Sequence, residues 1–126
     1  MGRISALLLV VAGVIHLLPL QGVMGASMVA RLYGVAVSDP NLEVLLRHRA
    51  VMFGLLGVLL LAAAWRVELR GVAFAAGLIS AGGFLVVAAL VGDYNRLIGR
   101  VVIADVVAVI CLLLGVAAEW ASRRPV

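Results

Sequence analysis

Two ionisable side chains interrupt long apolar runs in this chain of 126 residues. Asp105 lies within the apolar run 101–118, and His16 lies within the run 4–20. In a bilayer such a residue costs about 3 kcal/mol or more unless it faces the bundle interior and finds a partner. We therefore predict that Asp105 meets His16 or an arginine inside a helical bundle. Such a pair would either fix the register of the helices or handle protons at a functional site.

Arginines cluster close to these two residues along the predicted helices. Arg96 and Arg100 lie one turn apart near a predicted helix N-terminus, where the helix dipole disfavours cations. Asp93, Asp105 or a bound anion should therefore compensate them, and guanidinium groups suit phosphate and carboxylate. The sequence predicts an anion-binding mouth, and the alternative is a set of arginines that extend to the membrane interface. The candidate ligand-binding residues are His16, Arg47, His48, Arg49, Asp93, Tyr94, Arg96, Arg100 and Asp105.

The histidines also raise the question of a metal or haem site. Imidazole and thioether ligands suit copper, and two imidazoles can hold a haem. The spacing of His16, His48 and the methionines is not diagnostic, and methionine commonly fills irregular apolar space. The main prediction is therefore that no metal or cofactor is bound. The alternative is haem or copper at His16 and His48.

The composition indicates a membrane protein rather than a soluble domain. Apolar residues make up 66% of the chain and charged residues 13%, against about half and about a quarter in soluble domains. The length allows a single integral membrane domain, 1–126. The net charge of +4 comes from arginines at the ends of apolar segments, which membrane topology explains without a nucleic-acid partner. The predicted partners are membrane lipids, with a homo-oligomer or a larger membrane complex as the alternative.

Four apolar runs are long enough to span a bilayer. They cover about residues 4–20, 48–65, 72–92 and 98–120. The second helix is expected to begin earlier, at Pro40 with Asp39 as its N-cap, and to pair Glu43 with Arg47 one turn later. A short interfacial helix is expected to end at Gly34. The predicted fold is an all-α membrane protein, a four-transmembrane-helix bundle with a short interfacial helix between spans 1 and 2.

Small residues recur at four-residue spacing in three of the predicted spans. The pairs are Ala50 with Gly54, Ala76 with Ser80, Gly77 with Ala81, and Ala104 with Ala108. This spacing lets helix backbones approach closely in lipid. It predicts tight packing of the bundle at all four pairs.

The arginines also bear on orientation. Four spans place both termini on one side of the membrane, together with five arginines and two glutamates. The opposite side holds five arginines and four carboxylates. Since the arginines on the terminal side lack acidic neighbours and flank the first span, we predict cytoplasmic termini and a non-cytoplasmic polar mouth. The first run is expected to be a retained span, because residues 21–24 offer no small-x-small signal-peptide cleavage site.

Several stretches of the chain resemble a group of small bacterial four-span inner-membrane proteins. The stretches are residues 13–19, 32–34, 39–42, 46–50, 53–57, 92–95 and 100–105. The likeness covers nearly the whole chain, and its most specific parts are Arg-His-Arg at 47–49 and Arg-x4-Asp at 100–105. The resemblance implies the four-span fold and a location in the bacterial inner membrane.

Members of this group are often labelled phosphopantetheine adenylyltransferase. The genuine enzyme is a soluble α/β nucleotidyltransferase with a histidine-bearing phosphate loop after its first strand. This chain has no strand-loop-helix pattern, and its glycines lie inside apolar helices. We therefore do not expect this protein to be a genuine adenylyltransferase.

Three functions compete on these observations. The leading prediction is a non-enzymatic binding or accessory subunit, whose polar non-cytoplasmic pocket takes an anionic or lipid-like ligand. The alternative is an intramembrane enzyme acting on a lipid- or quinone-like substrate, with Asp105 or His16 handling protons. The second alternative is a small proton-coupled transporter, in which Gly82 and Gly83 would mark a discontinuous helix. An Asp105 enclosed by packed side chains, with no cavity beside it, would exclude binder and enzyme alike.

Overall fold

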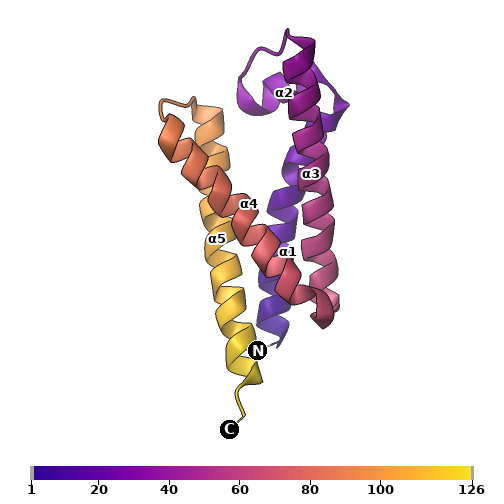
Figure 1. Ribbon diagram of the computed structural model, residues 1–126, viewed down its shortest axis with the longest axis vertical. Coiled ribbons are helices and arrows are strands. Elements are labelled where there is room, and N and C mark those ends of the chain that lie inside the picture. The colour runs from indigo at the N-terminus through magenta and orange to yellow at the C-terminus, as the bar shows by residue number, and fades with distance from the viewer. Residues whose placement is uncertain (1, 126) are drawn as a thin grey trace.

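The computed structural model describes residues 2–125, and within this range the chain forms helices and no strand (Figure 1). The elements are α1 (Gly2–Leu17), the 3-10 helix η1 (Leu18–Met24), α2 (Ala26–Tyr33), α3 (Pro40–Trp65), the 3-10 helix η2 (Val67–Leu69), α4 (Arg70–Val91) and α5 (Arg96–Arg123). Four stretches are long and apolar enough to cross a membrane: Gly2–Met24, Pro40–Trp65, Val67–Val91 and Arg96–Arg123. The predicted all-α, four-helix membrane fold is confirmed.

Local signals in the sequence explain where α2 and α3 begin or end. Gly34 closes α2 with a φ of 66°, in the left-handed region that favours glycine. The Asp39 side chain accepts a hydrogen bond from the Asn41 backbone N–H at 2.9 Å and caps α3. One turn later Arg47 Nη1 and Glu43 Oε1 form an ion pair of 3.1 Å. The predicted end of the short helix and the predicted start of α3 are therefore confirmed.

The first and third spans differ in detail from the predictions. The first span leaves α-helical geometry after Leu17 and continues to Met24 as η1, because Pro19 has no N–H with which to continue the α-helical hydrogen bonds. The third span contains Gly82 and Gly83, yet α4 runs without a break from Arg70 to Val91. The discontinuous helix that the transporter hypothesis requires is therefore not formed at these glycines.

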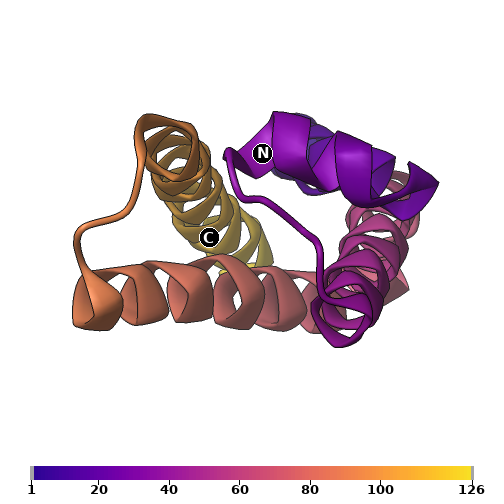
Figure 2. The same ribbon diagram turned by 90° about the horizontal axis from the view of Figure 1, so that it is seen from above.

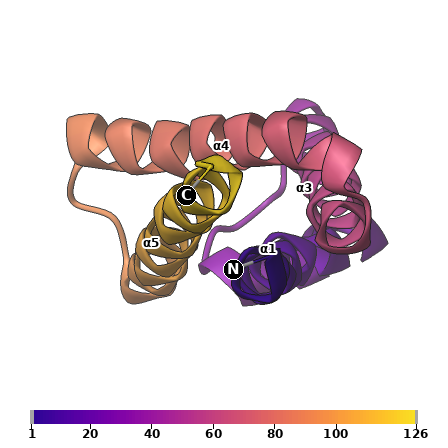
Figure 3. The ribbon, with the colours of Figure 1, turned by 90° about the horizontal axis from the view of Figure 1, so that it is seen from below.

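Each spanning helix packs against two others, in the order α1, α3, α4, α5 around the bundle (Figures 2 and 3). Both ends of the chain lie at one end of the bundle, here called the terminal end (Figure 1). The opposite end, here called the α2 end, carries α2 and the turn between α4 and α5. Helices α3 and α4 are joined through η2 at the terminal end and diverge toward the α2 end.

The packed core occupies the terminal half of the bundle. Its buried residues include Leu9 on α1, Leu60 on α3, Phe74 on α4 and Leu112 on α5. Small residues admit close packing, as predicted, in two of the four pairs: Ala50 with Gly54, and Gly77 with Ala81, are buried between helices. In the pair Ala104 with Ala108, only Ala108 is buried, and Ala104 lines a cavity. The pair Ala76 with Ser80 is different.

The prediction that Ala76 and Ser80 pack helix against helix is wrong. Both residues line an open cleft between α3 and α4, because the two helices have already diverged at this level (Figure 1). Small side chains on a helix face that has no helix close against it leave space for another occupant. This cleft is the first part of the candidate site.

Candidate functional site

Arg49 is the residue around which the α2 end is organised. Its guanidinium carbon lies 5.4 Å from the centroid of the Tyr33 ring, and Arg49 Nη1 donates a hydrogen bond of 3.1 Å to Tyr33 Oη. The same carbon lies 4.6 Å from the Phe53 ring centroid and 5.5 Å from that of Phe84. These distances are those of cation–π contacts. Arg49 therefore joins α2, α3 and α4 through three aromatic rings while its charge stays half-buried.

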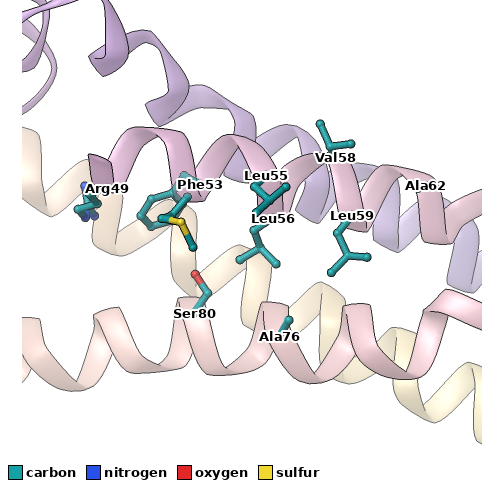
Figure 4. Close-up of a pocket in the computed structure, with 10 residues that line it drawn as sticks. Arg49, Phe53, Leu55, Leu56, Val58, Leu59, Ala62, Ala76 and Ser80 are labelled. Atoms are coloured by element: carbon teal, nitrogen blue, oxygen red, sulfur yellow. The ribbon is translucent and has the colours of Figure 1, made fainter. Parts of the chain in front are cut away.

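An apolar cleft of about 740 Å³ runs from Arg49 along the space between α3 and α4 (Figure 4). Its lining residues are Arg49, Met52, Phe53, Leu55, Leu56, Val58, Leu59, Ala62, Ala76 and Ser80. From Arg49 to Ala62 the cleft is about 20 Å long at 1.5 Å per residue. It thus has one charged end, a long apolar wall, and the Ser80 hydroxyl on the opposite helix.

A second cavity, of about 300 Å³, lies between α1, η1, α2, α3 and α5. It is lined by Ile15, Leu18, Pro19, Arg31, Leu32, Phe53, Leu97, Arg100, Val101, Ala104 and Asp105. Phe53 lines both the cleft and this cavity. Asp105 is only 4% exposed, so its burial in the bundle is confirmed, and it lies on the wall of a cavity rather than in a packed core. The condition that would have excluded binder and enzyme is therefore not met.

The predicted direct pairing of Asp105 is wrong within residues 2–125. Asp105 Oδ2 has no hydrogen-bond partner there, and Asp105 forms no ion pair with a described residue. The ring of His16, which is 1% exposed, instead uses Nδ1 for a hydrogen bond of 2.8 Å with the Ala12 carbonyl. Since a carbonyl only accepts, Nδ1 carries the proton in this bond. His16 is thus tied to its own helix, and Arg49 acts on Asp105 only through space.

The remaining candidates lie at the α2 end but outside both cavities. Arg47 binds Glu43 and donates a hydrogen bond of 3.1 Å to the Val23 carbonyl, so it fixes η1 to α3. The others are exposed: His48, Asp93, Tyr94 and Arg96. Among the described residues, neither Asp93 nor Asp105 forms the predicted ion pairs with Arg96 and Arg100. Exposed arginines at this end are free to be solvated, which removes the need for such pairs.

The site also contains residues that the sequence did not single out. Arg31 lines the Asp105 cavity, and Tyr33, Phe53 and Phe84 surround Arg49. Arg31 and Tyr33 lie in the short helix α2, which the sequence predicts only as an interfacial element. Phe53 lies four residues after Arg49, one helical turn away, and this spacing was the available signal for that contact.

Residues 2–125 contain no cluster of side chains typical of a metal centre. Within the described range 2–125, no three His, Cys, Asp or Glu side chains are grouped so that they can hold a metal ion. His16 is buried against Phe53, with ring centroids 5.8 Å apart, whereas His48 is exposed on α3. Haem or copper at these two histidines stays the alternative to the predicted absence of a cofactor.

We compared the chain with protein families, with curated proteins and with solved structures, and none of them matches it. The functional argument therefore starts from the geometry of the cleft and the cavity.

Proposed function

We propose that this protein is a binding or accessory subunit that takes an anionic amphiphile in a bacterial inner membrane. One observation carries the proposal: Arg49 stands at one end of an apolar cleft of about 740 Å³ between α3 and α4. An amphiphile has the same two parts, an anionic headgroup and an apolar chain. Its headgroup would lie at Arg49 and its chain along the leucines of α3.

The dimensions of the cleft support a lipid chain as its occupant. The cleft is about 20 Å long, which is longer than half of the hydrocarbon core of about 30 Å. It therefore covers the depth that a lipid chain reaches from one membrane surface. Where the two helices diverge, the side chains that α4 contributes to the cleft are small, Ala76 and Ser80, and most of those from α3 are large.

The state of Arg49 supports an anionic headgroup. The guanidinium is held by Tyr33, Phe53 and Phe84 without a carboxylate partner among residues 2–125. Aromatic rings position the guanidinium and leave it without a direct ion pair, since Asp105 acts on it only through space. A guanidinium binds phosphate through two parallel hydrogen bonds. A lipid phosphate supplies that missing ion pair.

We expect Ala76→Phe to lower lipid binding, because its ring fills the cleft opposite Leu56 and Leu59. The probe is phosphatidylglycerol, counted by native mass spectrometry on protein released from micelles that contain it. Arg49→Gln should lower binding about tenfold or more, as the loss of a hydrogen bond to a charged group does. The matched control is Ala89→Phe, the same change at an exposed position of α4 that lies outside the cleft.

Two results would contradict this proposal. Wild-type levels of bound phosphatidylglycerol on Ala76→Phe would show that the lipid does not use the cleft. A wild-type dimer that Ala76→Phe separates would instead make the cleft a contact between two copies of the chain. The same mass spectrum reports both quantities.

The proposed orientation places the termini in the cytoplasm and the α2 end outside. Its support is Arg3, which flanks the first span on the terminal side. The expected lack of acidic neighbours on that side is wrong for Arg70 and Arg123, which both pair with Glu119. Ser38 lies in the connection between α2 and α3 at the α2 end. In a Cys111→Ser background, we expect Ser38→Cys to react with a membrane-impermeant thiol reagent added to spheroplasts. Labelling that requires membrane lysis would reverse the orientation.

A further inference from the structure

The cavity that contains Asp105 has features that the cleft does not share. Asp105 lies on its wall, 4% exposed, and its Oδ2 is buried without a hydrogen-bond donor from residues 2–125. A buried carboxyl oxygen that lacks a donor is strongly unfavourable. Asp105 lines the cavity, which has room near this residue for a ligand group that carries N–H or O–H donors.

Two arginines lie on the same cavity in a different environment. Arg31 of α2 and Arg100 of α5 both line the cavity, and both are exposed. Neither forms an ion pair with any described residue of the chain. Two guanidinium groups on the outer part of a cavity favour a phosphate or a carboxylate.

The positions of these groups define the ligand. Arg100 and Asp105 lie on one helix, five residues and about 7.5 Å apart along its axis. An anionic group near the arginines and a donor group at Asp105 must therefore belong to two ends of a short molecule. An ammonium suits the inner end, because it supplies three donors and a charge opposite to that of the carboxylate.

We infer that this cavity binds a phosphoethanolamine unit, with its ammonium on Asp105 and its phosphate on Arg31 and Arg100. The juxtaposition of an unpartnered buried carboxyl with two unpaired arginines on one cavity carries this inference. The site is separate from the α3–α4 cleft, so this inference does not depend on amphiphile binding in the cleft. Only Phe53 lines both spaces.

The test compares two soluble ligands that differ in their donors. O-Phosphoethanolamine and O-phosphocholine carry the same phosphate, but the trimethylated nitrogen of the second has no N–H. Both are titrated by calorimetry into wild-type protein in nanodiscs of phosphatidylglycerol. We expect O-phosphoethanolamine to bind about ten- to a hundredfold more tightly, the range that corresponds to hydrogen bonds with a charged group. Equal affinities for the two, or binding no tighter than that of inorganic phosphate, would overturn the inference.

Substitutions assign the two ends of the ligand. Asp105→Asn should remove the preference for O-phosphoethanolamine over O-phosphocholine, and Arg100→Gln should weaken both ligands together. The matched controls are Asp93→Asn and Arg96→Gln, exposed residues at the same end of the bundle that do not line the cavity. Wild-type discrimination by Asp105→Asn would overturn the inference. If Asp105→Asn does not fold, the comparison of ligands on wild-type protein still decides.

The source of the unit is either a free molecule or a lipid headgroup, and the bilayer distinguishes them. The titration is repeated in nanodiscs that contain phosphatidylethanolamine. If the lipid occupies the cavity, the apparent affinity for O-phosphoethanolamine falls as the lipid fraction rises. If it does not fall, the free zwitterion is the ligand. Both results support the cavity as a phosphoethanolamine site.

Discussion

Replacing Arg70 with methionine is expected to destabilise the bundle by about 3–5 kcal/mol, the range for breaking a buried ion pair. Arg70 is 5% exposed at the start of α4, and its Nη1 lies 2.7 Å from Glu119 Oε2 on α5. The same side chain donates hydrogen bonds to the carbonyls of Ala63 and Ala64 at the end of α3, and to the carbonyl of Gly2 on α1. One guanidinium thus connects all four spanning helices at the terminal end.

The expected loss has two physical components. Methionine has about the right length to fill the space but no donors, so the carbonyls of Ala63 and Ala64 lose partners at a helix end that has few others. Glu119 keeps its ion pair with Arg123, at 3.3 Å, which limits the cost on the acidic side. Glu119→Gln keeps the bonds from Arg70 to the carbonyls but leaves the buried Arg70 guanidinium without a counter-charge, so it should also destabilise the bundle.

The single cysteine of the chain makes the measurement direct. Cys111 is half-buried in α5, and its reaction with a thiol-specific dye in mixed micelles of increasing SDS content reports unfolding. Arg66→Met is the matched control, because Arg66 is exposed and its side chain forms no ion pair with residues 2–125. Equal stability of Arg70→Met and Arg66→Met would show that the contacts of Arg70 do not hold the helices together.

The fold of this protein was predictable because its strongest determinants are local. Long apolar runs in the sequence predict the helices that face lipid. The ends of α2 and α3 follow from Gly34, Asp39 and Pro40, whose effects reach only a few residues. The divergence of α3 from α4 was not predictable, since it depends on the crossing angle that packing at the terminal end imposes. The predicted packing of Ala76 and Ser80 failed for that reason.

The candidate site was predictable in position but not in its pairings. Sorting residues by membrane side placed Asp105, Arg49 and Arg100 at one end of the bundle, and the structure has them there. Which groups touch depends on rotation of each helix about its axis. His16 bonds to Ala12 on its own helix, and Arg49 lies among aromatic rings rather than beside a carboxylate. The positions of charged residues in the sequence do not determine which side chains come into contact.

The contacts of Arg70, at the terminal end, were also not predictable from the sequence. By position it belongs with Arg66 among the arginines expected to anchor a helix at the membrane surface. In the structure Arg70 is buried and Arg66 is exposed. The difference follows from the turn at η2, which directs Arg70 inward beneath the end of α3.

Gly57→Ala is expected to destabilise the bundle by about 1–3 kcal/mol, the usual range for overpacking a close contact. A Cβ at Gly57 would lie 2.8 Å from Leu17 Cγ and 3.0 Å from the Gly13 carbonyl oxygen. The contact is reciprocal, because a Cβ at Gly13 would lie 3.2 Å from the Gly57 carbonyl oxygen and 2.9 Å from Leu61 Cγ. The backbones of α1 and α3 meet here. A side chain can rotate away, but a backbone carbonyl moves only if its helix moves.

Gly82→Ala separates this steric effect from the general effect of replacing a helical glycine. A Cβ at Gly82 would meet no atom within 4 Å in the described part of the chain. Alanine also favours a helix over glycine by about 1 kcal/mol, so Gly82→Ala should be neutral or stabilising in the same Cys111 assay. If Gly57→Ala behaves like Gly82→Ala, then α1 and α3 do not touch at their backbones. If Gly13→Ala and Gly57→Ala each destabilise and their combination costs less than the sum, one shared contact is responsible, since a helix already displaced by the first Cβ accommodates the second.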